Sequence, residues 1–430
     1  MPRFFHLFIA LLALGGGIGL ISWWENRQTP AFFCDAAGQP AAYQGQWFYR
    51  LHQGPDGWLF RDDDLAQTFS ISSQTLRYLG QLNAGLAAKG VTLILAAQPP
   101  RGTALPTGSL PGYNPATVSA EYRELREALE KRGLHVTNLA VVVAKTPHYF
   151  FKRDHHWTPE GAEASASAVA QTIQASPAYG QVANRQQAFS THAVRDEEQV
   201  GSYGGAIGRI CGENPPAERL TRTSTEPENP GSGSLFGNAP PPPIALAGTS
   251  NSARKDLNFA GFLEEATGLE VLNTSAVGGG PEAALETYLR SKTFIESPPT
   301  FLVWEFATLF DVPQNPVFYR QLLPSLRGAC SVHESSANVT KPVTERTTLF
   351  SEAPDGSSRY LYLEFSDLSL KTFDLELNYQ NGTQETLTLR RSGRENNDGR
   401  FFLELNGTLS SATLIMSSEA SGEVGAKVCP

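Results

Sequence analysis

The sequence predicts an α/β domain with a mostly parallel sheet, followed by an all-β sandwich domain. Up to about residue 306, apolar runs of strand length alternate with segments of helical periodicity, which is the pattern of strands buried on both faces of a parallel sheet. After residue 330, short alternating strands are separated by Asn-Gly and Asp-Gly turns, and no helix is evident. A length of 430 residues is too great for one ordinary core and favours two domains.

The first domain is expected to alternate strands with helices. The predicted strands are 91–97, 134–143, 244–247, 271–272 and 300–306. The predicted helices are 72–88, 116–132, 159–175, 281–290 and a segment from the turn at 248–250 to about 267. Polar, Gly-rich and Pro-rich residues interrupt this order between 179 and 243, and the prolines at 240–243 form a stiff run that is not expected to be regular structure.

The second domain is expected to contain strands alone. The predicted strands are 359–365, 372–379, 386–390, 401–405 and 413–416. We place the catalytic domain at 30–328 and the β-sandwich at 329–430.

The N-terminus has the features of an export signal. Arg3 precedes a nearly unbroken apolar run from Phe4 to Trp24, so residues 1–25 are interpreted as a secretory signal peptide. No clean small-x-small cleavage site follows, and the run is about long enough to span a bilayer, so an uncleaved inner-membrane anchor is the alternative. Either reading places the bulk of the chain in the periplasm. The net charge of −9 argues against a nucleic-acid partner.

The four cysteines fit an oxidising compartment, and three pairings are open to them. A bond between Cys330 and Cys429 would close a loop of roughly 100 residues around the second domain, worth about 4–5 kcal/mol in the chain-entropy model. That bond would leave Cys34 to pair with Cys211. No pair has the spacing of metal ligands, so neither a metal nor another cofactor is expected.

A candidate catalytic base lies at the start of a predicted helix. Asp154 and His156 are two positions apart, so their side chains point the same way if the segment is extended. Thr158 is expected to cap the helix, and Pro159 suits its first position. An acid beside an imidazole can orient the ring and stabilise its charge while it deprotonates a hydroxyl. His155 is the alternative base.

The hydroxyl is expected to come from Ser250. This serine follows the strand 244–247 on a Gly-Thr-Ser turn that opens a helix, which is the setting of an exposed nucleophile at the carboxyl edge of a sheet. Backbone N–H groups of that helix, with a second from 278–280, would bind an oxyanion. The side-chain donors considered for it are Asn251, Asn258 and Asn273.

Either motif alone also fits an ordinary helix cap or a surface turn. Their combination in an exported α/β chain, with both at carboxyl ends of strands, favours the catalytic interpretation.

These residues resemble a known family. The run Asp-His-His-Trp-Thr-Pro-Glu-Gly-Ala at 154–162 and Gly-Thr-Ser-x-Ser-Ala at 248–253 are similar to motifs of the SGNH-hydrolase-like domain of the alginate O-acetyltransferases, the AlgX/AlgJ group. Further matches lie at 54–60, 258–263 and 304–306. The resemblance covers about residues 30–430. The trailing β-domain and the four cysteines favour the AlgX branch, which carries a C-terminal carbohydrate-binding module.

The resemblance implies an activity and a role for each site residue. An acetyl group would pass to mannuronate hydroxyls of alginate through an acetyl-serine intermediate. Ser250 would be the nucleophile, His156 the base and Asp154 the acid that orients it.

Arginines are expected to hold an anionic polysaccharide, because guanidinium groups match carboxylates. The arginines clustered at one predicted hairpin are Arg390, Arg391, Arg394 and Arg400. The aromatic residues proposed as stacking faces are Tyr360, Tyr362, Tyr379 and Phe401. The alternative is a solvated hairpin with interior aromatics. Arg101 is a further candidate for a substrate carboxylate near the triad, and a loop salt bridge is its alternative.

Three functions compete on these observations. The first is an O-acetyltransferase that takes acetyl from a donor protein or a small acetyl ester, in a complex with polysaccharide-secretion proteins. The second is a carbohydrate acetylesterase with the same triad, which passes the acetyl group to water. The third is a noncatalytic scaffold that binds the polymer through the C-terminal domain.

Overall fold

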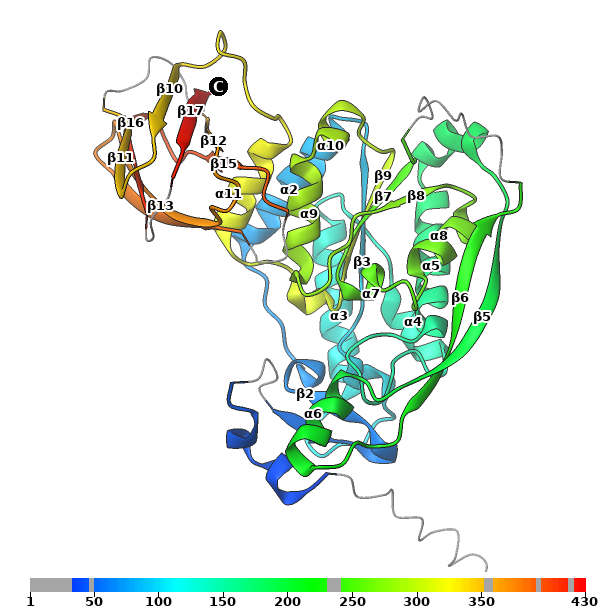
Figure 1. Cartoon of the computed structure of the whole chain (residues 1–430). Helices are drawn as coiled ribbons and strands as arrows, with labels where there is room; N and C mark the ends of the chain where they lie inside the picture. The colour runs from blue at the N-terminus through cyan, green and yellow to red at the C-terminus, as the bar shows by residue number, and fades with distance from the viewer. Residues whose placement is uncertain (1–32, 46–49, 230–240, 352–358, 392–395, 417–420) are drawn as a thin grey trace, which may run out of the picture.

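The computed structural model describes residues 33–45, 50–229, 241–351, 359–391, 396–416 and 421–430. The predicted signal peptide or anchor at 1–25 and Arg394 lie outside these ranges. Within the ranges, no helix has both the length and the apolar character that a bilayer crossing needs. An α/β body carries a β-sandwich at one end (Figure 1).

A five-stranded parallel sheet forms the centre of the α/β body. Its strands lie in the order β4-β3-β9-β7-β8, and every neighbouring pair is parallel. The strand bounds are β3 (Thr92–Ala97), β4 (His135–Val136), β7 (Ile244–Ala247), β8 (Val271–Asn273) and β9 (Phe301–Phe306). In β3, Leu93 and Leu95 face one hydrophobic core while Ile94 and Ala96 face another. The prediction of strands buried on both faces is therefore confirmed.

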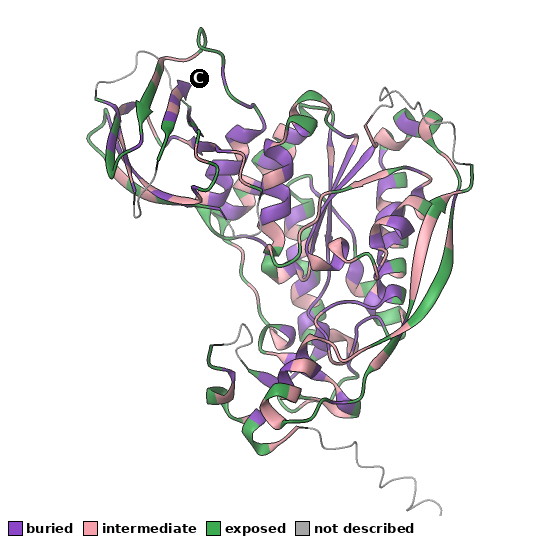
Figure 2. Cartoon of the chain, viewed as in Figure 1, coloured by how far each residue is buried: buried purple, intermediate pink, exposed green. Residues whose placement is uncertain are grey.

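Helices cover both faces of this sheet and turn their buried sides toward it (Figures 1 and 2). The helices on one face are α2 (Ser73–Ala87), α3 (Pro115–Glu130), α9 (Gly280–Arg290) and α11 (Pro316–Ser325). The helices on the other face are α5 (Pro159–Gln174) and α8 (Phe259–Thr267). A short α10 (Lys292–Glu296) follows α9. The antiparallel pair β1 (Leu51–Gln53) and β2 (Leu59–Arg61) precedes all of them.

The strand predicted at 134–143 is wrong over most of its length. Only β4 is extended, and α4 (Leu139–Lys145) follows it. Leu139 and Val143 are buried while Val141 between them is 45% exposed, so the run has the spacing of a helix with one buried side.

The helix predicted from Ser250 to about 267 is divided in two. The first part, α7 (Ser250–Ala253), is a single turn, and α8 begins only at Phe259. Asn258 adopts a left-handed φ of 53° between them, which a continuous helix does not allow.

The segment 179–243 contains regular structure that the sequence analysis missed. The strands β5 (Phe189–Gln199) and β6 (Glu218–Pro227) form a long antiparallel hairpin along the outside of the body, and α6 (Ser202–Cys211) lies between them (Figure 1). Most side chains of β5 are exposed, so its sequence lacks the apolar alternation that marks a half-buried strand.

The C-terminal part is the predicted all-β sandwich. Two antiparallel four-stranded sheets, β10-β17-β12-β15 and β11-β16-β13-β14, enclose one apolar core. The strands that match predicted ones are β12 (Tyr360–Phe365), β13 (Thr372–Tyr379), β14 (Gln384–Arg390), β15 (Arg400–Glu404) and β16 (Leu409–Ile415). The strands that were missed are β10 (Ala337–Pro342), β11 (Arg346–Phe350) and β17 (Glu423–Cys429).

Both expected disulfides are present. Cys34 is bonded to Cys211 and joins the N-terminal segment to the end of α6. Cys330 is bonded to Cys429 and joins the two ends of the sandwich.

Candidate active site

The loop before α5 holds Asp154 and His156 in place. Phe150 and Trp157 form an isolated antiparallel bridge that brackets the loop. The Thr158 hydroxyl accepts the N–H of Gly161 and caps α5, whose first residue is a proline, as predicted. The helix cap therefore fixes the point from which the two side chains extend.

Ser250, which is distant in sequence, meets Asp154 and His156 at this loop. The Nδ1 atom of His156 lies 2.5 Å from Oδ1 of Asp154. On the other side of the ring, Nε2 lies 2.8 Å from Oγ of Ser250, which is 94 positions further along the chain. When Nδ1–H donates to Asp154, Nε2 presents its lone pair to the serine hydroxyl. Asp154 and His156 are 3% and 6% exposed, so little water competes for these bonds.

Asp154 is held in its charged form. Burial alone would raise its pKa, but the hydrogen bond and charge of His156 outweigh burial and hold the pKa well below its usual range. Its Oδ1 also accepts the backbone N–H of His156 at 3.0 Å, and its Oδ2 accepts that of Ser202 at 2.8 Å. Ser202 begins α6, so an element that the sequence analysis missed anchors the acid.

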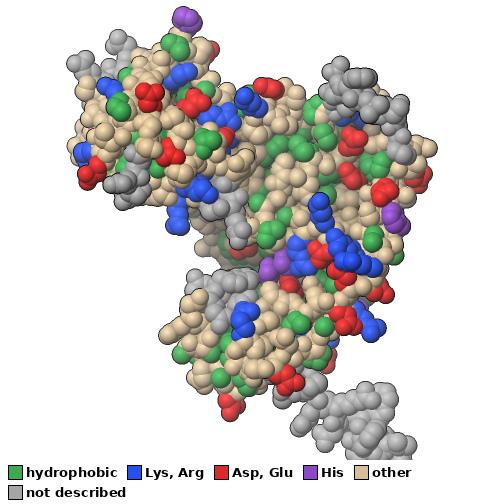
Figure 3. Space-filling view, in the orientation of Figure 1, with side chains coloured by type: hydrophobic (Ala, Val, Ile, Leu, Met, Phe, Trp, Pro, Cys, Tyr) green, Lys and Arg blue, Asp and Glu red, His purple; other side chains and the backbone are tan. Residues whose placement is uncertain are grey.

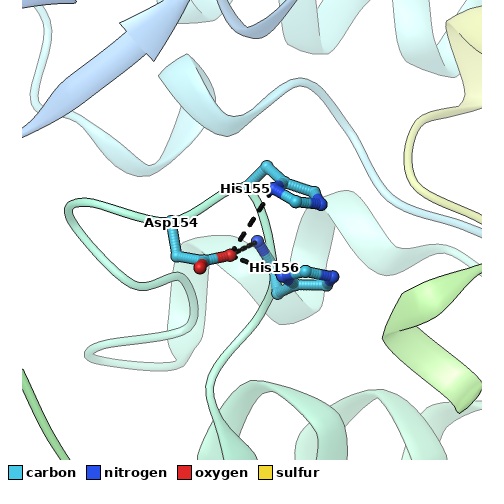
Figure 4. A group of neighbouring side chains, drawn as sticks. All are labelled: Asp154, His155 and His156. Carbon is cyan, nitrogen blue, oxygen red and sulfur yellow. Dashed lines mark hydrogen bonds and ion pairs between the residues drawn. The ribbon is translucent and has the colours of Figure 1, made fainter. Parts of the chain in front are cut away.

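His155 points to the same carboxylate without replacing His156 (Figure 4). Its Nδ1 lies 3.6 Å from Asp154 Oδ1 and 2.8 Å from the hydroxyl of Ser202. Burial, followed by the nearby charge of His156, lowers the pKa of His155 to about 3, so this ring is neutral at physiological pH. The interaction with Ser202 gives His155 a supporting place beside the triad.

Asp154, His155 and His156 also satisfy the spacing of a metal site. One ligand atom from each lies within 4.8 Å of the others. However, Oδ1 of Asp154 already accepts two hydrogens from His156, and Nε2 of His156 faces Ser250. The contacts are those of an acid–imidazole–hydroxyl relay, in which both ring nitrogens of His156 are engaged.

The turn that carries Ser250 closes around a carboxylate. Thr249 is the N-cap residue of α7. Glu305 of β9, which is wholly buried, accepts the N–H of Thr249 at 2.8 Å and the hydroxyl of Ser252 at 2.9 Å. The Trp-Glu-Phe run at 304–306 contributes to the family resemblance, but nothing in the run itself indicates this contact.

Each of the three asparagines considered as oxyanion donors already donates its side-chain amide to another residue. The amide of Asn251 donates to Glu305 at 3.4 Å, that of Asn273 to the Ser252 carbonyl at 2.8 Å, and that of Asn258 to two threonine hydroxyls of β6. The loop after β8 runs beside the turn, because the Ala276 N–H donates to the Gly248 carbonyl at 3.0 Å. Backbone N–H groups therefore remain the proposed oxyanion donors.

Arg101 has a structural role in place of the predicted contact with substrate. It is 4% exposed, and its guanidinium donates to the Leu59 carbonyl and to Asp64, each at 3.0 Å. The Phe151 carbonyl accepts a further bond at 2.5 Å. Four aromatic rings surround the group with centroids 5.2 to 5.7 Å from its carbon. The alternative of a loop salt bridge describes this residue better, although the pair that it forms with Asp64 is buried.

The C-terminal arginines also differ from prediction. Arg391 is 2% exposed and forms an ion pair with Glu286 of α9. Arg400 donates to the Arg290 carbonyl at 2.6 Å and pairs with Asp398. Both residues join the sandwich to the α/β body, and Arg391 is too buried to reach a polymer. Arg390 is exposed, so its role in polymer binding stays a prediction.

The four aromatic residues predicted to stack on sugars are interior. Tyr360, Tyr362 and Tyr379 are between 3% and 4% exposed, and Phe401 is 0% exposed. The Tyr360 hydroxyl donates to the Gly328 carbonyl at 3.0 Å and that of Tyr379 to Glu385 at 2.8 Å. Strand residues that alternate in a sandwich face its core as readily as a ligand, so the sequence pattern did not separate the two roles.

The parallel sheet, with a serine on the turn after β7 and a histidine–aspartate pair before α5, defines a protein of the SGNH hydrolase-like class. The family model "SGNH hydrolase-like domain, acetyltransferase AlgX" matches residues 51–308, and a C-terminal carbohydrate-binding module matches 350–429. The chain therefore belongs to the AlgX family.

Named relatives and solved structures agree with this assignment. The alginate biosynthesis protein AlgX of Pseudomonas aeruginosa is 33% identical over 388 residues, which cover 86% of this chain and 81% of that protein. A structure of P. aeruginosa AlgX superposes with a TM-score of 0.80 at 30% identity and covers 92% of this chain and 98% of the other. The O-acetyltransferase domain of P. putida AlgJ gives 0.50 at 25% identity, over 62% and 94%.

Proposed function

We propose that this protein is an exported O-acetyltransferase that acetylates hydroxyls of a uronic-acid polymer, with mannuronate residues of alginate as the preferred acceptor. The observation that carries the proposal is the 2.8 Å separation between Ser250 Oγ and His156 Nε2, with Asp154 behind the ring. Membership of a family whose relatives include proteins named probable alginate O-acetylase supports the transfer of acetyl groups.

The geometry supports a two-step transfer. In the first step Ser250 Oγ attacks the acetyl carbonyl of the donor, and its proton passes to His156 Nε2 and then to the leaving oxygen. In the second step a polymer hydroxyl gives its proton to His156 and attacks the acetyl-serine, and His156 then returns the proton to the departing Ser250 Oγ, which restores the free serine and the neutral imidazole. Asp154 stabilises the imidazolium in both steps, and backbone N–H groups of the nucleophile turn bind the oxyanion.

A basic region beside α7 supports an anionic acceptor. A cavity of about 600 Å³ adjoins the nucleophile turn. The basic residues that line it are Arg195, Arg222, Arg254 and Lys255. Glu197 and Asp256 pair with the three arginines and offset part of this charge. Figure 3 shows Lys and Arg side chains gathered next to a histidine near the middle of the molecule. Carboxylates of a uronate chain would exchange with these pairs.

The two disulfides support a periplasmic location, because such bonds persist in oxidising compartments. The C-terminal module supports polymer binding, with Arg390 as the described arginine still proposed for it. The acetyl donor would be a partner protein or a small acetyl ester, and proteins of a polysaccharide-secretion complex would be neighbours.

Acetylation of mannuronate oligomers by the purified protein tests this function. With a small acetyl ester as donor, mass spectrometry should find acetylated oligomers for the wild type and none for Ser250→Ala. Ser119→Ala, on α3, removes a hydroxyl that donates only to the Pro115 carbonyl of its own helix and should match the wild type. Release of free acetate without acetylated oligomers would favour the esterase. Full transfer by Ser250→Ala would contradict the mechanism, and retained polymer binding without any transfer in the wild type would favour the scaffold.

A further inference from the structure

A carboxylate lies beneath the nucleophile turn without touching the nucleophile. Glu305 belongs to β9, the central strand of the sheet, whose neighbours β3 and β7 pair with it on either side. Its side chain is 0% exposed, and the other residues of the strand are all apolar and buried. An isolated carboxylate in such a place costs free energy unless hydrogen bonds satisfy it.

The hydrogen bonds that satisfy Glu305 come from the residues around Ser250. The Thr249 N–H and hydroxyl donate to it at 2.8 Å and at 3.0 to 3.1 Å. The Ser252 hydroxyl donates at 2.9 Å and the Asn251 amide at 3.4 Å. One carboxylate thus holds the residue before the nucleophile and the two residues after it, while the Ser250 side chain is left to His156.

The turn needs an outside support because α7 is too short to hold its own orientation. It contains four residues, and isolated helices of that length are not stable. Gly248 completes the arrangement, since a Cβ atom there would lie 2.6 Å from Glu305 Oε2 and push the carboxylate away. The position of the turn relative to the sheet therefore depends in part on this acid, together with the contacts from Asn273 and Ala276.

We propose that Glu305 is a positioning residue that keeps Ser250 Oγ within hydrogen-bond reach of His156 Nε2. The inference rests on the proposed function only in taking Ser250 as the nucleophile. Burial raises the pKa of Glu305, and the hydrogen bonds from Thr249, Ser252 and Asn251 oppose that rise.

Glu305→Gln and Glu305→Ala test the proposal, with Glu286→Gln as the matched control. Glu286 is also a buried acid, at 4% exposed, but it lies on α9 and pairs with Arg391 of the C-terminal sandwich. Glutamine keeps one acceptor for the Thr249 N–H, whereas alanine leaves that N–H without a partner. Each variant is assayed for melting temperature, for kcat and KM with a small acetyl ester, and for the rate of covalent labelling by a fluorophosphonate.

The expected result is a fall in kcat and in labelling rate of about 10- to 100-fold for Glu305→Gln, with KM little changed, because small displacements of a nucleophile have effects of this size. Glu305→Ala should fall further, and Glu286→Gln should label at the wild-type rate whatever its melting temperature. Equal labelling rates in all the folded variants would overturn the proposal.

A crystal structure of Glu305→Gln separates this proposal from the proposed function. The distance between Ser250 Oγ and His156 Nε2 should exceed the 2.8 Å of the parent protein. An unchanged distance would overturn the positioning role even if activity fell. A wild-type protein that neither reacts with the phosphonate nor transfers acetyl would instead refute the proposed function, while this distance would still decide the role of Glu305.

Discussion

His155 lies beside the catalytic pair but does not carry charge at neutral pH. The rings of His155 and His156 are tilted to each other with centroids 3.8 Å apart, and both lie near the same carboxylate. If both rings were protonated, their repulsion would oppose the imidazolium that catalysis needs at His156. Burial, the charge of His156 and the guanidinium groups of Arg61 and Arg101 lower the pKa of His155 and prevent this. Because the His155 ring is neutral, it does not compete with His156 for the negative charge of Asp154.

Stability should depend on pH through His155. Its pKa is about 3 in the folded protein, against an ordinary value of about 6.5, so between these values the unfolded chain binds a proton that the folded protein does not. This contribution is complete above about pH 6.5 and is lost as the pH falls. The His155 side chain retains 23% exposure, which moderates the effect.

Urea denaturation at pH 7.5 and 5.5 measures this contribution. The wild type should lose roughly 1 kcal/mol more free energy of unfolding across this interval than His155→Asn. Equal losses in the two proteins would contradict the neutral state assigned to His155. The lowered pKa of Asp154 acts only at more acidic pH and does not enter the comparison.

At the scale of elements, local sequence signals correctly predicted structure that depends on neighbouring residues. They did not predict structure that depends on contacts between distant segments. The cap at Thr158 and the proline after it placed the start of α5 correctly, because both act within one helical turn. Nothing in the sequence near Asp154 indicates that the first N–H of α6 would bind it 48 positions away. The buried glutamate under the turn was missed for the same reason, since an acid within an apolar strand reveals its partners only in three dimensions.

The link between α6 and Asp154 can be tested by removing one hydrogen-bond donor. Ser202 is the first residue of α6, where proline is well tolerated, so Ser202→Pro deletes the N–H to Asp154 without an internal helix break. Ser202→Ala deletes only the hydroxyl that meets His155 and is the matched control. Loss of a hydrogen bond to a charged group is worth about 1.5–3 kcal/mol, so kcat should fall about 10- to 100-fold in Ser202→Pro and less in Ser202→Ala. Equal kcat values in the two variants would show that the amide has no role.

At the scale of the whole molecule, buried ion pairs join the sandwich to the α/β body. Glu286 of α9 pairs with Arg391, and Arg320 of α11 forms a bidentate contact with Glu385 at 2.5 and 3.0 Å. Arginine clusters in a β-domain were predicted to bind polymer because the sequence shows charge without showing what the charge faces. The structure assigns Arg391 and Arg400 to the contact between the sandwich and the α/β body, which lie against each other in Figure 1.

Arg391→Met should destabilise the protein by about 3–5 kcal/mol, because it leaves the Glu286 carboxylate buried without a partner. The double variant Glu286→Met/Arg391→Met should recover much of that loss, since two apolar side chains replace the pair. Chemical denaturation of the two single variants and the double variant measures the coupling. If the losses in free energy of unfolding were additive, the ion pair would not contribute to the contact between the two domains.

The central claim is that Ser250, activated by His156 and Asp154, carries the acetyl group. The most direct measurement is peptide mass spectrometry of the protein after brief reaction with p-nitrophenyl acetate and an acid quench, without polymer. We expect one acetyl group on the peptide that contains Ser250, its disappearance when mannuronate oligomers are added before the quench, and its absence from His156→Ala. Turnover of acetyl groups with no acetyl on Ser250, or an acetylated Ser250 that oligomers never discharge, would contradict this account.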